Sequence, residues 1–147
     1  MNNILYLIYG IPGSGKTTKA NELINKYKSL NLPIDHWEAD MFFEDPKTRK
    51  YNFDPTKLFQ AHKWCQEQCL NSMKNKRDVI ISNTSLTPKE RKPYINFAKE
   101  FNYTIIFIEA TGNFQNVHNV PNEKIELMKK KFTPILPDET EDLVTNE

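Results

Sequence analysis

The residues best suited to chemistry are the eight from Gly10 to Thr17, which read Gly-Ile-Pro-Gly-Ser-Gly-Lys-Thr. The chain has only four glycines, and three of them, Gly10, Gly13 and Gly15, lie here. Glycines let backbone N–H groups approach an anion with no Cβ in the way, and the lysine adds positive charge. The spacing G-x-x-x-x-G-K-[ST] therefore predicts a loop that wraps the phosphates of a nucleoside triphosphate.

Seven residues are expected to contact the nucleotide: Gly10, Gly13, Ser14, Gly15, Lys16, Thr17 and Thr18. Lys16 is expected to bridge the β- and γ-phosphates, as a catalytic residue, and the Thr17 hydroxyl to ligate Mg²⁺. The nucleotide is expected to be ATP. ATP and Mg²⁺ are thus the predicted cofactors.

The segments around this motif must hold it in place. Residues 4–9 form a continuous apolar run, which is typical of a strand buried on both faces. Further strands are predicted at 34–39, 79–81 and 103–109, and helices at 16–30, 54–73, 87–101 and 121–132. Because strands and helices alternate, we predict an α/β fold, a parallel sheet of about four strands with helices on both faces.

Ligands of a parallel sheet gather at the carboxyl ends of its strands. These ends contribute Asp40, the run Asn83, Thr84 and Ser85, and Glu109. Asp40 is the predicted catalytic carboxylate, because a carboxylate beside the γ-phosphate can accept a proton from an attacking hydroxyl; the alternative is a solvated turn aspartate. The third strand is followed by the neutral Ser82 and Asn83, so metal binding is expected to rely on Thr17, phosphate oxygens, water and Asp40.

Composition places the chain among ordinary globular proteins. Its 147 residues are 38% hydrophobic and 27% charged, which favours one domain, residues 1–133. Residues 134–147 carry five acids and no Lys or Arg, and are expected to form a loosely held acidic tail. The remainder then carries a net charge of +6, which suits a polyanionic ligand, although a lysine-rich surface without a function is an equal alternative.

Several classes of protein are excluded or disfavoured. No apolar run approaches the ~20 residues of a membrane span, and the first residues lack the features of a secretory signal. Two cysteines, Cys65 and Cys69, are too few for a disulfide framework or a zinc quartet. A cytoplasmic protein with no membrane contact is expected.

Beyond the phosphate-binding motif, an ordered series of segments resembles a known family. The sequence is similar to the P-loop kinase domain of phage polynucleotide 5′-hydroxyl kinase, and closer still to the kinase-like domains of ubiquitin-ligase-binding proteins. The resemblance covers about residues 4–132, and its matching segments are 10–18, 39–40, 51–53, 61–64, 79–84, 92–94 and 118–125.

This resemblance implies a P-loop NTPase fold and ATP- and Mg²⁺-dependent phosphoryl transfer to the 5′-hydroxyl of DNA or RNA. It implies that Asp40 is the general base. It also implies that the acceptor groove contains Asn83, Thr84 and Ser85.

The sequence departs from the family in its arginines. Such kinases carry a lid arginine that clamps the transferring phosphate, whereas here the segment after Glu109 is short and reads Gln-Asn-Val-His at 115–118. Phe43 also stands where the phage kinase has an arginine. The chain has three arginines against seventeen lysines, and none follows Arg91. Arg91 is therefore the leading internal candidate for contact with substrate. The other candidates are Arg49, a lysine, or an arginine from a protein partner or a second copy of the chain.

Three functions remain open at this stage. The first is a polynucleotide 5′-hydroxyl kinase, and the second is a kinase of a nucleoside, a modified base or a small metabolite. The third is a catalytically weak ATP-binding module that acts through a partner, which the lost lid arginine favours. Aromatic residues interleave with cations across residues 42–53, and either stack nucleic-acid bases or fold onto one another.

Overall fold

The computed structural model describes residues 3–112, 120–140 and 144–145. Their sheet has the strand order β2-β3-β1-β4-β5, and all neighbouring strands are parallel. The strands are β1 (Ile4–Tyr9), β2 (Ile34–Trp37), β3 (Asp78–Ile81), β4 (Thr104–Glu109) and the two-residue β5 (Val144–Thr145). The predicted parallel sheet is confirmed, and β5 adds an edge strand that the sequence did not predict.

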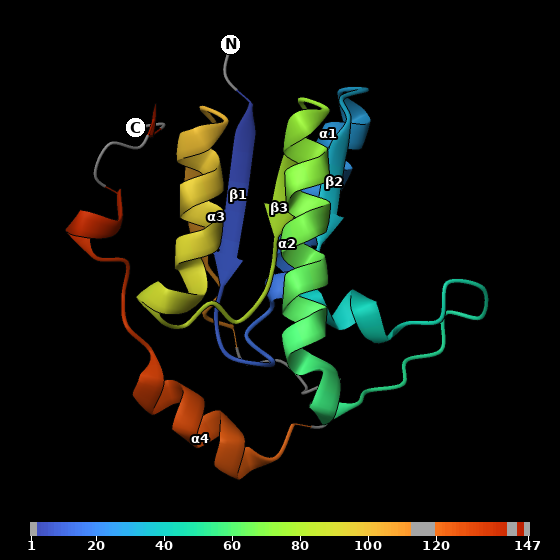
Figure 1. Cartoon of the computed structure of the whole chain (residues 1–147), viewed down its shortest axis with the longest axis vertical. Helices are drawn as coiled ribbons and strands as arrows, with labels where there is room; N and C mark the ends of the chain where they lie inside the picture. The colour runs from blue at the N-terminus through green and yellow to red at the C-terminus, as the bar shows by residue number, and fades with distance from the viewer. Residues whose placement is uncertain (1–2, 113–119, 141–143, 146–147) are drawn as a thin grey trace.

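Helices cover both faces of the sheet, as predicted. In Figure 1, α2 (Leu58–Lys74) and α3 (Pro88–Glu100) lie on one face and α1 (Lys16–Ser29) on the other. The last helix, α4 (Asn122–Lys131), lies below the arrowheads of the strands, at the carboxyl edge of the sheet. Short 3-10 helices span Ala39–Phe43, Pro55–Lys57 and Pro137–Thr140. In the described part of the chain, no helix is both long enough and apolar enough to cross a membrane.

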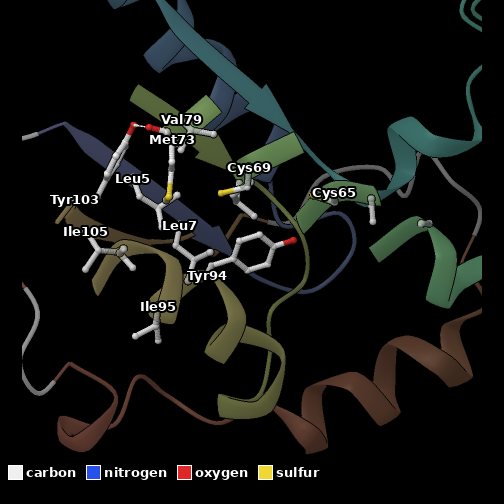
Figure 2. Packing of buried hydrophobic residues seen from close by; sticks show 14 of the residues in the cluster. Leu5, Leu7, Cys65, Cys69, Met73, Val79, Tyr94, Ile95, Tyr103 and Ile105 are labelled. Carbon is white, nitrogen blue, oxygen red and sulfur yellow. Dashed lines mark hydrogen bonds between the residues drawn. The ribbon is translucent and has the colours of Figure 1, made fainter. Parts of the chain in front are cut away.

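The central strand β1 explains why its sequence is continuously apolar. Leu5 and Leu7 point into the layer under α2 and α3, whereas Tyr6 and Ile8 point toward α1. Because alternate side chains of a strand face opposite sides, two covered faces require an unbroken apolar run. Figure 2 shows side chains from α2 and α3 meeting those of β1 in the first of these layers.

Two helix starts follow from capping residues. Thr87 accepts a hydrogen bond from the Glu90 N–H, and Pro88 is the first residue of α3, so the predicted capping box is confirmed. Asp54 caps the short helix Pro55–Lys57, and α2 begins only after it.

The C-terminal segment is held against the domain by a buried ion pair. Arg91 is fully buried, and its Nε and Nη2 atoms donate to the two carboxylate oxygens of Glu139 at 2.8 and 3.0 Å. Nη1 donates to the Ser85 carbonyl at 2.9 Å, and Nη2 also reaches the Pro134 carbonyl at 3.3 Å. Arg91 therefore anchors the segment at Glu139 and at the Pro134 carbonyl, whereas the expected boundary at residue 133 stays a prediction.

This pairing also corrects the expectation that Arg91 contacts substrate. A fully buried guanidinium requires a carboxylate and further hydrogen-bond acceptors, and residues far along the chain provide them. The pairing partner lies 48 positions away, so no local pattern could reveal it. Arg91 joins α3, the loop after β3 and the C-terminal segment, and its role is structural.

We expect Glu139→Gln to lower the free energy of unfolding by about 3 kcal/mol at neutral pH, because the Arg91 guanidinium stays buried without its counter-charge. Burial by itself raises the pKa of Glu139, but hydrogen bonds from Arg91 and the Leu136 N–H outweigh it and hold that pKa below its ordinary value of 4.5. The stabilisation is therefore complete above pH 4.5 and is lost as the pH falls through the lowered pKa. Urea denaturation of the wild type and the variant at several pH values measures this.

The exposed pair between Arg49 and Glu44 is a suitable control. Its closest N–O distance is 3.8 Å and the arginine side chain is 82% exposed. Arg49→Gln should therefore cost at most about 1 kcal/mol. If Glu139→Gln costs no more than Arg49→Gln, the C-terminal segment is not held by its ion pair.

Candidate active site

The loop between β1 and α1 requires glycine for two different reasons. Gly13 and Gly15 have φ angles of 79° and 95°, a region in which a side chain is strained. At Gly10 the reason is space, because a Cβ atom would lie 2.5 Å from the Ser14 Oγ and 2.7 Å from the Ala110 carbonyl oxygen. The loop leads into the N-terminus of α1, whose first turn carries no acidic residue. This arrangement is suited to an anion, as predicted.

Lys16, the first residue of α1, bends back over this loop. Its Nζ donates to the Ile11 carbonyl at 3.0 Å. Burial disfavours the charged form and lowers the pKa of Lys16 to about 8, and the nearby carboxylates of Glu38 and Asp40 offset part of this effect. The side chain is thus partly desolvated and ready to exchange a backbone carbonyl for a more strongly anionic partner.

A cleft of about 670 Å³ opens at the carboxyl edge of the sheet. Gly13, Gly15, Lys16, Thr17 and Thr18 line one side. The cleft is also lined by Asp40, Asn83 and Thr84, and by residues of α4 that include Lys124 and Met128. The structure therefore brings together most of the residues that the sequence selected, from three strand ends.

Asp40 is held in a defined position at this edge. It lies in the 3-10 helix Ala39–Phe43 directly after β2, and the Tyr51 hydroxyl donates to its Oδ1 at 3.2 Å. The helix itself is fixed by Asn83, whose Oδ1 accepts from the Ala39 N–H at 2.7 Å. Asn83 lines the cleft, and it also positions the turn that carries Asp40.

Thr84 has a second role besides lining the cleft, and four other predicted residues, Gly10, Ser14, Ser85 and Glu109, do not line it. The Thr84 carbonyl accepts from the Gly10 N–H at 3.0 Å, which ties the loop after β3 to the phosphate-binding loop. Ser85 is buried, and its carbonyl is bound by Arg91 rather than facing the cleft. Gly10, Ser14 and Glu109 line a second hollow of about 220 Å³ on the other side of the loop. The end of β4 therefore does not join the main cleft.

The arginines of the chain are bound to carboxylates elsewhere. Arg77 donates to Asp35 at 2.9 Å, Arg49 is exposed beside Glu44, and Arg91 is buried against Glu139. Among the described residues that line the cleft, the cationic side chains are Lys16 and Lys124. The prediction of a shortened lid without arginine concerns residues 115–118, which lie outside the described residues.

Sequence reasoning missed Glu38, which lines the cleft together with Lys16 and Ser82. Phe53, which belongs to the aromatic stretch that the sequence selected, also lines the cleft, as does His62. The aromatic residues of 42–53 do fold onto one another, since Phe43 contacts both Tyr51 and Phe53 edge to face. Phe53 nevertheless remains 44% exposed within the cleft, so this cluster also offers a surface to a ligand.

The donor set of the cleft fits a magnesium ion bound together with phosphates. Mg²⁺ typically takes one or two carboxylates, keeps several waters and shares the oxygens of a substrate phosphate. The described residues contain no group of three or more His, Cys, Asp or Glu side chains that could enclose a metal by themselves. The Thr17 hydroxyl and the nearby carboxylates suit a phosphate-dependent site of this kind.

The buried strand, the glycine loop and the helix that begins at Lys16 define a P-loop protein. A family model described as an AAA domain matches residues 5–135. The chain belongs to this AAA domain family, and the resemblance to P-loop kinases seen in its sequence is confirmed.

Individual relatives support the same placement. Human NEDD4-binding protein 2 is 31% identical over 140 residues, which cover 88% of this chain and only 8% of that protein. The structure of Chaetomium thermophilum Kti12 in complex with ADP-AlF3 has a TM-score of 0.67 at 14% identity, over 97% of this chain and 88% of that one. The Pnkp1/Rnl/Hen1 complex contains a chain with a TM-score of 0.57 at 21% identity, over 95% of this chain and 43% of that one. At these identities the solved structures show a shared fold.

The lowered pKa of Lys16 predicts how nucleotide affinity depends on pH. Only the charged ammonium pairs with phosphate, so the dissociation constant for ADP should be constant below about pH 8 and rise toward tenfold per pH unit above it. Calorimetric titration with ADP at a series of pH values measures this. Lys16→Ala should bind weakly at every pH, with no inflection near 8. An inflection that persists in Lys16→Ala would assign the titration to another group.

Proposed function

We propose that this chain is an ATP- and Mg²⁺-dependent kinase that transfers the γ-phosphate to a hydroxyl, and that its acceptor is the 5′-hydroxyl of DNA or RNA. The observation that carries the proposal is the placement of Asp40. Its carboxylate lines the same cleft as Lys16 and the phosphate-binding loop, and it is held by Tyr51. The resemblance to polynucleotide 5′-hydroxyl kinases supports the choice of acceptor.

The residues of the cleft have different roles in this proposed reaction. Asp40 accepts the proton of the attacking hydroxyl, while the bond between the γ-phosphorus and the bridging oxygen breaks and ADP leaves. Lys16 and the N–H groups of the loop stabilise charge on the phosphate oxygens. Thr17 holds Mg²⁺, which when bound neutralises charge on the β- and γ-phosphates.

The shape of the cleft favours a nucleic-acid end over a small molecule. Phe53 and Tyr51 are stacked on each other with their rings 10° from parallel, and both line the cleft. An exposed aromatic edge of this kind suits a base next to the reacting hydroxyl. A cytoplasmic location fits a nucleic-acid substrate. A nucleoside or small-metabolite acceptor remains the alternative that the open cleft favours less.

Charge on the transferred phosphoryl group needs a cation besides Lys16, and the arginines are paired elsewhere. We propose that Lys124, in the first turn of α4, supplies it, because it lines the cleft across from the phosphate-binding loop. The competing explanation is an arginine supplied by a protein partner or a second copy. The third explanation is a nucleotide-binding module with little turnover.

A transfer assay with labelled ATP and oligonucleotides that end in a 5′-hydroxyl tests the reaction. The wild type should transfer label, and Asp40→Asn should lower kcat by at least about 100-fold with little change in ADP affinity, because only proton transfer is affected. Asp45→Asn is a matched control, since Asp45 is an exposed turn residue outside the cleft. No transfer by the wild type, or full transfer by Asp40→Asn, contradicts the assignment. Transfer to nucleosides but not to oligonucleotides would favour the alternative acceptor.

The role of Lys124 has its own test in the same assay. Lys124→Ala should lower kcat by about tenfold to 100-fold and leave ADP affinity nearly unchanged, because charge develops on the phosphoryl group in the transition state. Lys130→Ala, on the same helix but outside the cleft, should have no effect. Equal rates for both variants, together with a large rate increase on adding a partner, would instead favour an arginine from outside the chain.

A further inference from the structure

The third strand of the sheet ends without an acid, and the structure shows what stands beside that end. β3 pairs directly with β1, with Ile81 opposite Leu7. The residue after Ile81 is the neutral Ser82, which lines the same cleft as the phosphate-binding loop. On its other side β3 pairs with β2, with Trp37 opposite Ile81. The same register places Glu38, the next residue of the neighbouring strand, beside Ser82.

Hydrogen bonds confirm this proximity and fix the carboxylate. The Ser82 hydroxyl donates to Glu38 Oε2 at 2.8 Å, and His36 Nε2 lies 2.6 Å from the same hydroxyl oxygen. Since the hydroxyl proton is directed to Glu38, the histidine donates through its Nε2–H. Burial lowers the pKa of His36 to about 4, so the ring is neutral at pH 7. Two side chains, His36 and Ser82, thus orient Glu38.

We propose that Glu38, held by Ser82 and His36, is the carboxylate that holds Mg²⁺ together with Thr17 in the nucleotide complex. It lines the cleft beside Lys16 and Thr17, and it takes the place of an acid that β3 does not provide. The inference rests on the proposed nucleotide site and adds the residue that binds its metal.

This assignment separates the two carboxylates of the cleft. Asp40 is bonded to Tyr51 on the side of the aromatic cluster, whereas Glu38 is bonded to Ser82 at the end of β3. Metal ligands are typically oriented by neighbouring hydrogen-bond donors, as Glu38 is here. The inference thus assigns the metal to Glu38 and proton transfer to Asp40.

A purely electrostatic role for Glu38 makes a different prediction. Glu38 is one of the carboxylates that stabilise the charged form of Lys16. If that were its whole function, removing its charge would strengthen or weaken nucleotide binding equally with and without metal. A metal-binding role instead requires that the effect of metal on binding be lost.

The test measures Mn²⁺ binding by electron paramagnetic resonance in the presence of saturating ADP, and ADP affinity by calorimetry with and without Mg²⁺. Glu38→Gln should weaken Mn²⁺ binding by about 10- to 100-fold and remove the gain in ADP affinity that Mg²⁺ provides, while ADP affinity in EDTA is retained. Ser82→Ala, which keeps the carboxylate but loses its donor, should weaken Mn²⁺ binding by a smaller factor. Glu38→Asp should restore part of it.

Glu44→Gln is the matched control, because Glu44 is another carboxylate near the same 3-10 helix and pairs with Arg49 at the surface. It should behave as the wild type. If Glu38→Gln binds Mn²⁺ as the wild type does, or if Asp40→Asn alone removes metal binding, the inference is overturned and the nucleotide site stands. If the wild type does not bind ADP even in EDTA, the proposed function fails as well.

Discussion

The geometry of the site depends on β1, which runs parallel to β3 and β4. At the carboxyl edge of the sheet, hydrogen bonds tie the end of β1 to the segments that follow both strands. The Gly10 N–H donates to the Thr84 carbonyl on one side, at 3.0 Å, and the Ala110 N–H donates to the Tyr9 carbonyl on the other, at 2.8 Å. These bonds are possible because β1, β3 and β4 run in the same direction and end at the same edge. The phosphate-binding loop therefore starts from a strand that is buried on both faces and held at both sides. Loops placed on such a rigid support keep the geometry that phosphate binding and transfer require.

Two carboxylates near Lys16 come from one short stretch of chain but have different surroundings. Glu38, directly after β2, is bonded to Ser82 at the end of β3, whereas Asp40 is bonded to Tyr51 from the loop that follows. The surroundings of a carboxylate, rather than its residue type, determine its chemical role. Two carboxylates with different neighbours can therefore bind a metal and accept a proton at the same time. Their negative charge also favours the ammonium form of Lys16 against the effect of burial.

The chain uses its few arginines to hold its structure together. Arg91 and Arg77 each bind a carboxylate distant in the sequence, Glu139 and Asp35 respectively. A planar guanidinium is well suited to such buried or half-buried pairs, because it satisfies several acceptors at once. As a result, the cationic side chains among the described residues that line the cleft are lysines. A compact ammonium can replace a guanidinium as a charge but not as a two-point clamp.

The sequence alone determined the phosphate-binding loop, the alternation of strands and helices, the cap at Thr87 and the candidacy of Asp40. Each of these depends on neighbouring residues or on hydrophobic period, and both are visible in a linear chain. Only the tertiary structure decided the partners of Arg91 and Glu38. Arg91 belongs to Glu139 because the C-terminal segment returns to α3, and Glu38 stands beside Ser82 because β2 pairs with β3 in one register. Contacts between residues more than 40 positions apart depend on strand order and register, which local spacing does not specify.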